Sequence, residues 1–411
     1  MKKTLLIIAG LILSVSVFAQ QFEAPQIDNT PFQKVKVKVG ADFAMQVQAL
    51  NQTADSLLVP IGSGFNLPTA NMNIGALLAP GIKVHLTVYL SSRHHEDTWV
   101  KGGYLILDRL PIEGTDNFMK YITLKAGVMG LNYGDAHFFY SDNGNVIRNP
   151  FVGNLILNSY TTAPAVELYV RNNKGLMLMG ALTTGTLKPS IASYSAYSGY
   201  SANNQFKQLA FYGKIAYDKT INNDFRFRVS ASGYFCAKNS FGSLYHGDRT
   251  GSRFYLVMVP QTNNASDVDI SANAWTGRWD MGFTDKDNSV MFNAFAKYKG
   301  LEVFGTLEKA KGTTAFSHKA FDMNQYELNA QYYFGQKQNF YIGGKINGVS
   351  GNDGTGVTDK KVSRFEGALG WFFTKNIIIK LDYVNQKYTN FAEYGNNAGF
   401  KGVMFEAGIS F

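Results

Sequence analysis

Charged side chains recur at every second position in several long segments of the chain. Arg226 and Arg228, for example, alternate with Phe225, Phe227 and Val229. Successive side chains of an extended strand point to opposite faces, so this spacing gathers the charges on one face. A row of fixed charges attracts or repels ions and polar solutes. The pattern therefore predicts electrostatic chemistry.

Residue types that support covalent or metal chemistry are few and scattered. The six histidines fall mostly in expected loops with no serine motif beside them: His85, His94, His95, His137, His246 and His318. The run His94-His95-Glu96-Asp97 is a candidate divalent-ion site, but adjacent histidines point apart on extended backbone. The single Cys236 excludes a disulfide framework and a thiolate metal cluster. We expect no enzyme activity, no cofactor and no metal site.

Composition narrows the class of protein. Only 17% of the 411 residues are charged, against about 25% in soluble domains. The 31 Phe, 23 Tyr and 4 Trp argue against disorder, and no stretch after the first residues is apolar for the length of a membrane-spanning helix. The pI of 9.2 comes from dispersed cations that form no patch, so we expect no nucleic-acid partner.

Residues 1–19 have the pattern of a signal peptide. A basic start, Met1-Lys2-Lys3, precedes an apolar run, and Val17-Phe18-Ala19 ends it like a cleavage site. A membrane anchor is the alternative, but the run is shorter than a spanning helix needs. Residues 20–33 are then expected to form a short periplasmic N-terminal segment, too short for a folded plug domain.

Residues 34–411 are predicted to form a transmembrane antiparallel up-and-down β-barrel. The alternating segments run for ten to fourteen residues, longer than strands of soluble sheets, and only a closed barrel satisfies backbone polar groups in a membrane. Short joints alternate with long polar loops, as periplasmic turns alternate with external loops. We count about sixteen strands; eighteen is the alternative if residues 239–288, interpreted as a long external loop, contain another hairpin. A soluble β-sandwich would not explain strands of this length with a polar face.

The chain resembles Gram-negative outer-membrane porins. An alternating strand ends in Phe411, and outward aromatic residues gather near the expected strand ends. Residues 122–134, ITLKAGVMGLNYG, more narrowly resemble porins of the phosphate-selective O and P type. The resemblance implies a homotrimer and a third loop, near 132–162, folded into the lumen. That family's anion selectivity rests on a ladder of lumenal arginines, whereas this loop offers only Arg148, so phosphate specificity is not expected.

The inward loop and the facing strands supply the predicted constriction. We expect a basic wall of Lys214, Arg226 and Arg228 opposite Asp135 and Asp142, with the remaining pore-lining residues as follows: Arg148 on the loop and Lys125 on a strand. These residues could equally be solvated lumenal side chains without a role in selectivity. Inward cations outnumber inward acids, which favours a mild preference for anions.

These observations predict a passive diffusion channel in the cell outer membrane. Its partners would be outer-membrane lipid and small hydrophilic solutes or ions, passing through a barrel wide enough to hold water. Two alternatives remain: a substrate-specific outer-membrane transporter, and a non-conducting structural or adhesive barrel.

Overall fold

The chain forms a closed antiparallel β-barrel of 16 strands. The computed structural model describes residues 20–26, 32–66, 68–91, 98–185, 209–238, 244–245, 252–261, 273, 276–314, 319–356 and 359–411. The expected signal peptide and the run His94-His95-Glu96-Asp97 lie outside the described residues. In the described part of the chain, no helix is both long and apolar enough to cross a membrane.

The first half of the wall contains β1 (Lys36–Thr53), β3 (Thr69–Ala79), β4 (Ile82–Ser91), β5 (Thr98–Leu107), β6 (Ile122–Gly130), β7 (Thr162–Arg171), β8 (Leu176–Thr183) and β9 (Ala210–Thr220). The second half contains β10 (Phe225–Cys236), β11 (Asp287–Tyr298), β12 (Leu301–Thr313), β13 (Ala320–Phe334), β14 (Phe340–Asn352), β15 (Lys360–Thr374), β16 (Ile377–Thr389) and β17 (Ala398–Ser410). The two-residue β2 (Gly64–Phe65) pairs with β1. Short helical turns occur at α1 (Asp116–Met119) and η2 (Ala136–Phe139).

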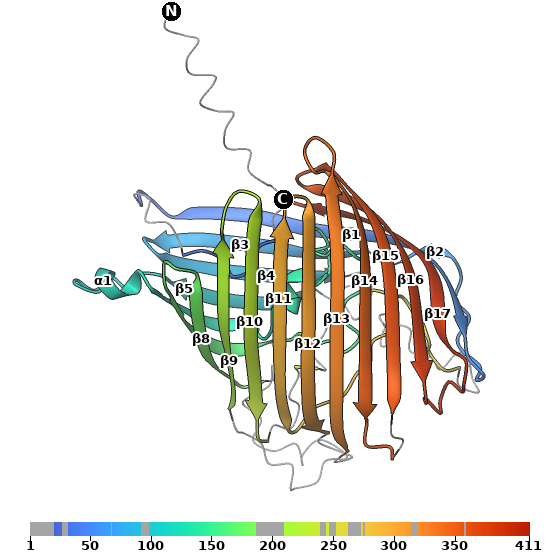
Figure 1. Ribbon diagram of the computed structural model, residues 1–411. Coiled ribbons are helices and arrows are strands. Elements are labelled where there is room, and N and C mark those ends of the chain that lie inside the picture. Colours follow the sequence, from blue (N-terminus) through green and yellow to red (C-terminus); the bar gives the residue numbers. More distant parts are fainter. Residues whose placement is uncertain are drawn as a thin grey trace, which may run out of the picture.

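Each strand pairs with its neighbour in sequence, and the first strand closes the barrel against the last (Figure 1). Asp42 of β1 lies opposite Ser410 of β17, and the ladder continues to Thr53 opposite Gly399. The chain end seals this seam, because the backbone of Phe411 exchanges two hydrogen bonds with Ala41, at 3.0 and 3.1 Å. In the described part of the chain, no edge strand is therefore left to pair with another chain.

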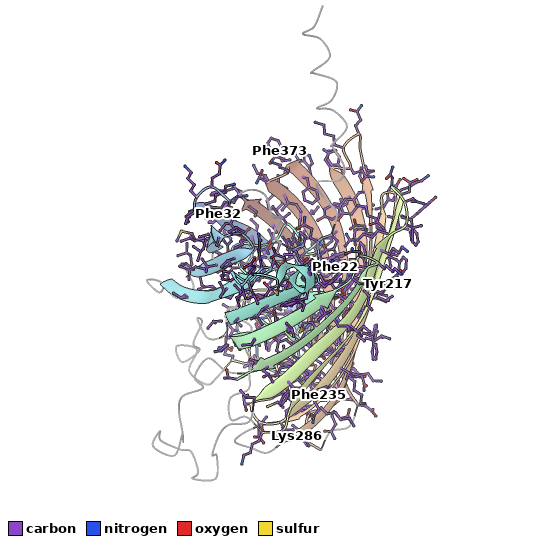
Figure 2. The ribbon with its side chains drawn as sticks, turned by 90° about the vertical axis from the view of Figure 1, so that its left-hand side faces the viewer. Phe22, Phe32, Tyr217, Phe235, Lys286 and Phe373 are labelled. Atoms are coloured by element: carbon purple, nitrogen blue, oxygen red, sulfur yellow. The ribbon has the colours of Figure 1, made fainter. Side chains whose placement is uncertain are left out.

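Alternating side chains give the wall an apolar outside and a polar inside. On β13, Tyr326 and Leu328 are half-exposed, whereas the inward Gln325, Glu327 and Asn329 are buried. Figure 2 shows Phe22 within the barrel, and Phe373 and Lys286 near its opposite ends. An exposed apolar band around a closed barrel is the surface expected of a protein embedded in lipid.

Most strands are joined by tight turns at one end and by longer loops at the other. The exception is the connection 108–121 between β5 and β6, which lies at the tight-turn end and carries α1. At the turn between β3 and β4, Gly81 has a φ of 68°, a conformation that glycine adopts without strain. The prediction of sixteen strands is confirmed. In the segment 239–288, the described residues before β11 form only an isolated bridge, between Pro260 and Leu58.

Candidate functional site

The loop between β6 and β7, residues 131–161, folds into the lumen, and we call it the inward loop. Its backbone is held by side chains on the far wall. The N–H groups of Val152 and Gly153 donate to carboxylates of Asp382 and Glu366, at 2.7 and 2.8 Å. The N–H groups of Ile156 and Leu157 donate to the following amide oxygens: Asn347 at 2.8 Å and Gln325 at 2.9 Å. Buried acceptors on β13 to β16 thus replace the water that an exposed loop would bind.

A buried ion cluster anchors the start of the inward loop to β9 and β10. Asp135 lies 2.9 Å from Nζ of Lys214 and 2.7 Å from Nε of Arg228, and it also accepts a hydrogen bond from Ser230 at 2.7 Å. Burial alone would raise the pKa of Asp135, but Lys214 and Arg228 outweigh burial and hold the pKa well below its usual range. The carboxylate is therefore ionised and paired.

The N-terminal segment, residues 20–26, joins this cluster from inside the barrel. Glu23 lies 2.8 Å from Nη2 of Arg228 and 3.4 Å from Nζ of Lys214. Burial would raise the pKa of Glu23, yet Lys214 and Arg228 lower it. We expected this segment to lie in the periplasm. Its described residues, 20–26, instead lie inside the lumen.

Aromatic packing holds the same segment in place. The ring of Phe22 is 5% exposed and lies 5.5 Å from Phe138 and 5.3 Å from Phe295, both edge-on. The guanidinium of Arg228 lies over the Phe22 ring at 4.4 Å. Because Phe138 belongs to the inward loop and Phe295 to β11, Phe22 links this loop to the wall.

Part of the long loop between β10 and β11 also fills the lumen. Arg253 is 1% exposed and lies 3.1 Å from the inward Glu406 of β17. The backbone N–H of Tyr255 donates to Gln48 of β1 at 2.8 Å. We expected residues 239–288 to stay outside as a surface loop. The structure instead folds its described residues 252–259 into the lumen, where all except Tyr255 are buried and where they contact inward polar side chains of the strands.

A cavity of about 750 Å³ remains on the side of the lumen formed by β1 and β3 to β6. The inward loop supplies Asp142 and Arg148, and the wall supplies side chains including Asp42, Asn73, His85 and Lys101. Phe411 and the turn residues Lys375 and Asn376 also line it, so the cavity reaches the end of the barrel that carries the short turns.

Most charges around the cavity are paired, and one on the inward loop is not. Lys101 forms an ion pair with Asp142, which also accepts a hydrogen bond from Tyr160 at 3.0 Å. Asp42 accepts hydrogen bonds from Asn73 and Ser410. The side chain of Arg148 is exposed, with no carboxylate of the described chain within ion-pairing distance. Arg148 is therefore the loop charge most available to a passing solute.

The residues predicted from sequence to form one constriction separate into three groups. Asp142 and Arg148 line the cavity. Asp135, Lys214 and Arg228 come together in the closed cluster, away from the cavity wall.

The other two predicted cations are engaged on the strands. Arg226 pairs with Asp218 at 2.7 Å. Lys125 lies 3.5 Å from Glu167 and over the ring of Tyr104. The predicted basic wall is thus a set of ion pairs.

Several functional candidates were not singled out from the sequence. Lys101 of β5 is one of many cations at alternating positions, and the alternation alone gives no reason to prefer it to the others. Phe22 and Glu23 lie outside the alternating pattern altogether. Among the described residues, no group of three or more His, Cys, Asp or Glu could hold a metal ion.

Comparisons with known proteins identify the fold. The sequence matches no protein-family profile and no curated protein. Among solved structures, the chain is similar to an anion-selective porin from Comamonas acidovorans, with 11% identity and a TM-score of 0.54 over 92% of this chain and 100% of that one. It is also similar to the outer membrane channel DcaP of Acinetobacter baumannii, with 11% identity and a TM-score of 0.53 over 92% and 98%.

A third similar structure is OprB of Pseudomonas putida, with 11% identity and a TM-score of 0.54 over 91% of this chain and 94% of that one. At these identities the likeness establishes a shared barrel architecture. It does not single out the phosphate-selective type of porin.

Proposed function

We propose that this barrel is an outer-membrane porin that lets small hydrophilic solutes diffuse passively through its lumen. The observation that carries the proposal is the polar cavity between the inward loop and β1 to β6, inside a barrel whose outer surface is apolar. A water-filled lumen lowers the free-energy barrier that polar solutes meet in the hydrocarbon core of the membrane. The inward loop narrows this lumen and sets the size limit.

The cavity charges favour a mild preference for anions. Arg148 and Lys375 are exposed, whereas Asp42 is buried and Asp142 is paired with Lys101. Selectivity follows the sign of the accessible charge where the passage is narrow and screening is weakest. The similarity to an anion-selective porin from Comamonas acidovorans agrees with this inference.

The barrel is proposed to act as a channel and not as an enzyme.

The barrel is also proposed to assemble as a homotrimer. The described, exposed large apolar side chains of β3 to β8 are all aliphatic, whereas those of β9 to β17 include many aromatic rings. Aromatic rings mark contact with the membrane interface, so an aliphatic sector suits contact with other copies. Cross-linking of the purified protein in mild detergent would give a trimeric band.

Planar bilayers test the channel. We expect discrete conductance steps on adding purified, folded protein, and reversal potentials in unequal KCl that indicate weak selectivity for chloride. Liposomes containing the protein should swell in small sugars and not in large ones. Folded, inserted protein without conductance would overturn the proposal and favour a structural or adhesive barrel.

A further inference from the structure

Three lysines point outward from neighbouring strands at the loop-bearing end of the barrel. Lys361 of β15, Lys387 of β16 and Lys401 of β17 are all exposed. Alternation places them on the outer face, because Phe365, Tyr383 and Val403 lie on the same faces and are exposed in the apolar band.

The strand register brings the three lysines into one diagonal row. In the strand ladder, Lys387 lies opposite Ser363, which is two residues from Lys361 on β15. Lys401 lies opposite Asn385, which is two residues from Lys387 on β16. Diagonal positions on neighbouring strands lie about 7–8 Å apart. Three ammonium groups can therefore reach a single anionic group or two adjacent ones.

No acidic side chain of the described chain lies within ion-pairing distance of these lysines. The adjoining loops contain Asp359 and Glu393, and neither forms an ion pair with them. The outward Lys309 and Lys311 of β12 differ, since both are paired with Asp322, at 3.0 and 2.7 Å. A row of like charges without a counter-ion is unfavourable unless an external anion neutralises it.

The row lies at the height of a membrane surface. Lys361 stands twelve positions from Phe373 on β15, about 40 Å along a strand at about 3.3 Å per residue. A strand tilt of about 40° reduces this to about 30 Å across the membrane, which exceeds the apolar band of about 25 Å. The lysines thus reach the headgroups of the leaflet on the loop side.

We propose that Lys361, Lys387 and Lys401 bind the phosphate groups of a phosphorylated glycolipid in the outer leaflet. Its acyl chains would lie on Phe365, Tyr383 and Val403 below the row, while Ser363 and Thr389, which share the outer faces, offer hydroxyl groups to the sugar. This inference rests on the proposed outer-membrane location and does not depend on channel activity.

Lipid binding by the purified, folded protein in detergent tests the site. The probe is bisphosphorylated lipid A, compared with the same lipid after dephosphorylation. The triple variant Lys361→Gln, Lys387→Gln, Lys401→Gln should bind bisphosphorylated lipid A about tenfold more weakly or worse, because each lysine near an anionic surface contributes to binding. The control variant Lys34→Gln, Lys36→Gln, Lys38→Gln removes three exposed lysines at the opposite end and should bind as the wild type does.

Two further measurements identify the source of the anion and exclude misfolding. Inorganic phosphate at millimolar concentration should not displace bisphosphorylated lipid A from the wild type. The dephosphorylated lipid should bind the wild type no more tightly than it binds the triple variant. The proposal would be overturned if the triple variant and the control variant bound bisphosphorylated lipid A equally well, or if inorganic phosphate displaced this lipid from the wild type. The far-UV circular dichroism spectrum of the triple variant should match that of the wild type, which verifies folding without relying on conductance and so separates this test from that of the channel.

Discussion

At the scale of single residues, Arg148 is the charge expected to bias ion flow. It is the exposed cation of the inward loop at the cavity, whereas Lys101 nearby is paired with Asp142. Arg148→Glu should move the reversal potential in unequal KCl toward cation selectivity, because it reverses a charge where screening is weak. Lys174→Glu, in the exposed turn between β7 and β8, makes the same change in charge and should leave the potential unchanged. An equal effect of the two substitutions would remove Arg148 from this role.

Asp135 is expected to matter for stability more than for selectivity. Asp135→Asn leaves buried Lys214 and Arg228 short of a counter-charge, and breaking a buried ion pair typically costs about 3–5 kcal/mol. Asp116→Asn breaks the exposed pair with Arg109, which is worth about 1 kcal/mol or less. Urea unfolding in detergent micelles measures both free energies. Similar losses for both variants would contradict the anchoring role of the cluster.

His137 makes the inward loop sensitive to acid. Burial lowers the pKa of His137 to about 3 in the folded protein, below an unfolded value of about 6.5. Between these pH values the unfolded chain binds a proton that the folded chain does not, so stability falls as pH falls.

From pH 7 to pH 5 this difference in proton binding corresponds to about 2 kcal/mol. Urea unfolding of the wild type and of His137→Phe at the two pH values measures it. The variant should lose about 2 kcal/mol less than the wild type, and an identical loss would show that His137 is protonated in the folded barrel.

At the scale of elements, the N-terminal segment is predicted to narrow the channel. Gln20 and Gln21 line the cavity, and Phe22 and Glu23 fix them there. Phe22→Ala combined with Glu23→Gln should release the segment and raise the single-channel conductance. Gln33→Ala, just before β1, is the control and should conduct as the wild type does. Unchanged conductance in the double variant would mean that residues 20–26 do not obstruct the passage.

The strands could be predicted from the sequence because their chemistry is local. Outward Val229 and inward Arg228 differ in polarity, and period-two alternation assigns each to a face without knowledge of the fold. The contacts inside the lumen could not be predicted in this way. Whether Arg228 faces water or a carboxylate depends on Asp135 and Glu23, which are distant in sequence and lie outside the alternating pattern. Polarity alone does not distinguish a solvated charge from a buried ion pair.

At the scale of the whole molecule, a channel for polar solutes requires that the apolar face of the wall contact lipid. Val229 is 48% exposed on the outer face, and Asn73 lines the cavity. In a Cys236→Ala background, a fluorophore on Val229→Cys should be quenched by brominated lipid and not by aqueous iodide. A fluorophore on Asn73→Cys should show the reverse, because the barrel separates an apolar solvent outside from water inside. Iodide quenching of the fluorophore at position 229 together with lipid quenching at position 73 would mean that the outer face meets water and the lumen meets lipid. The cavity could not then carry polar solutes.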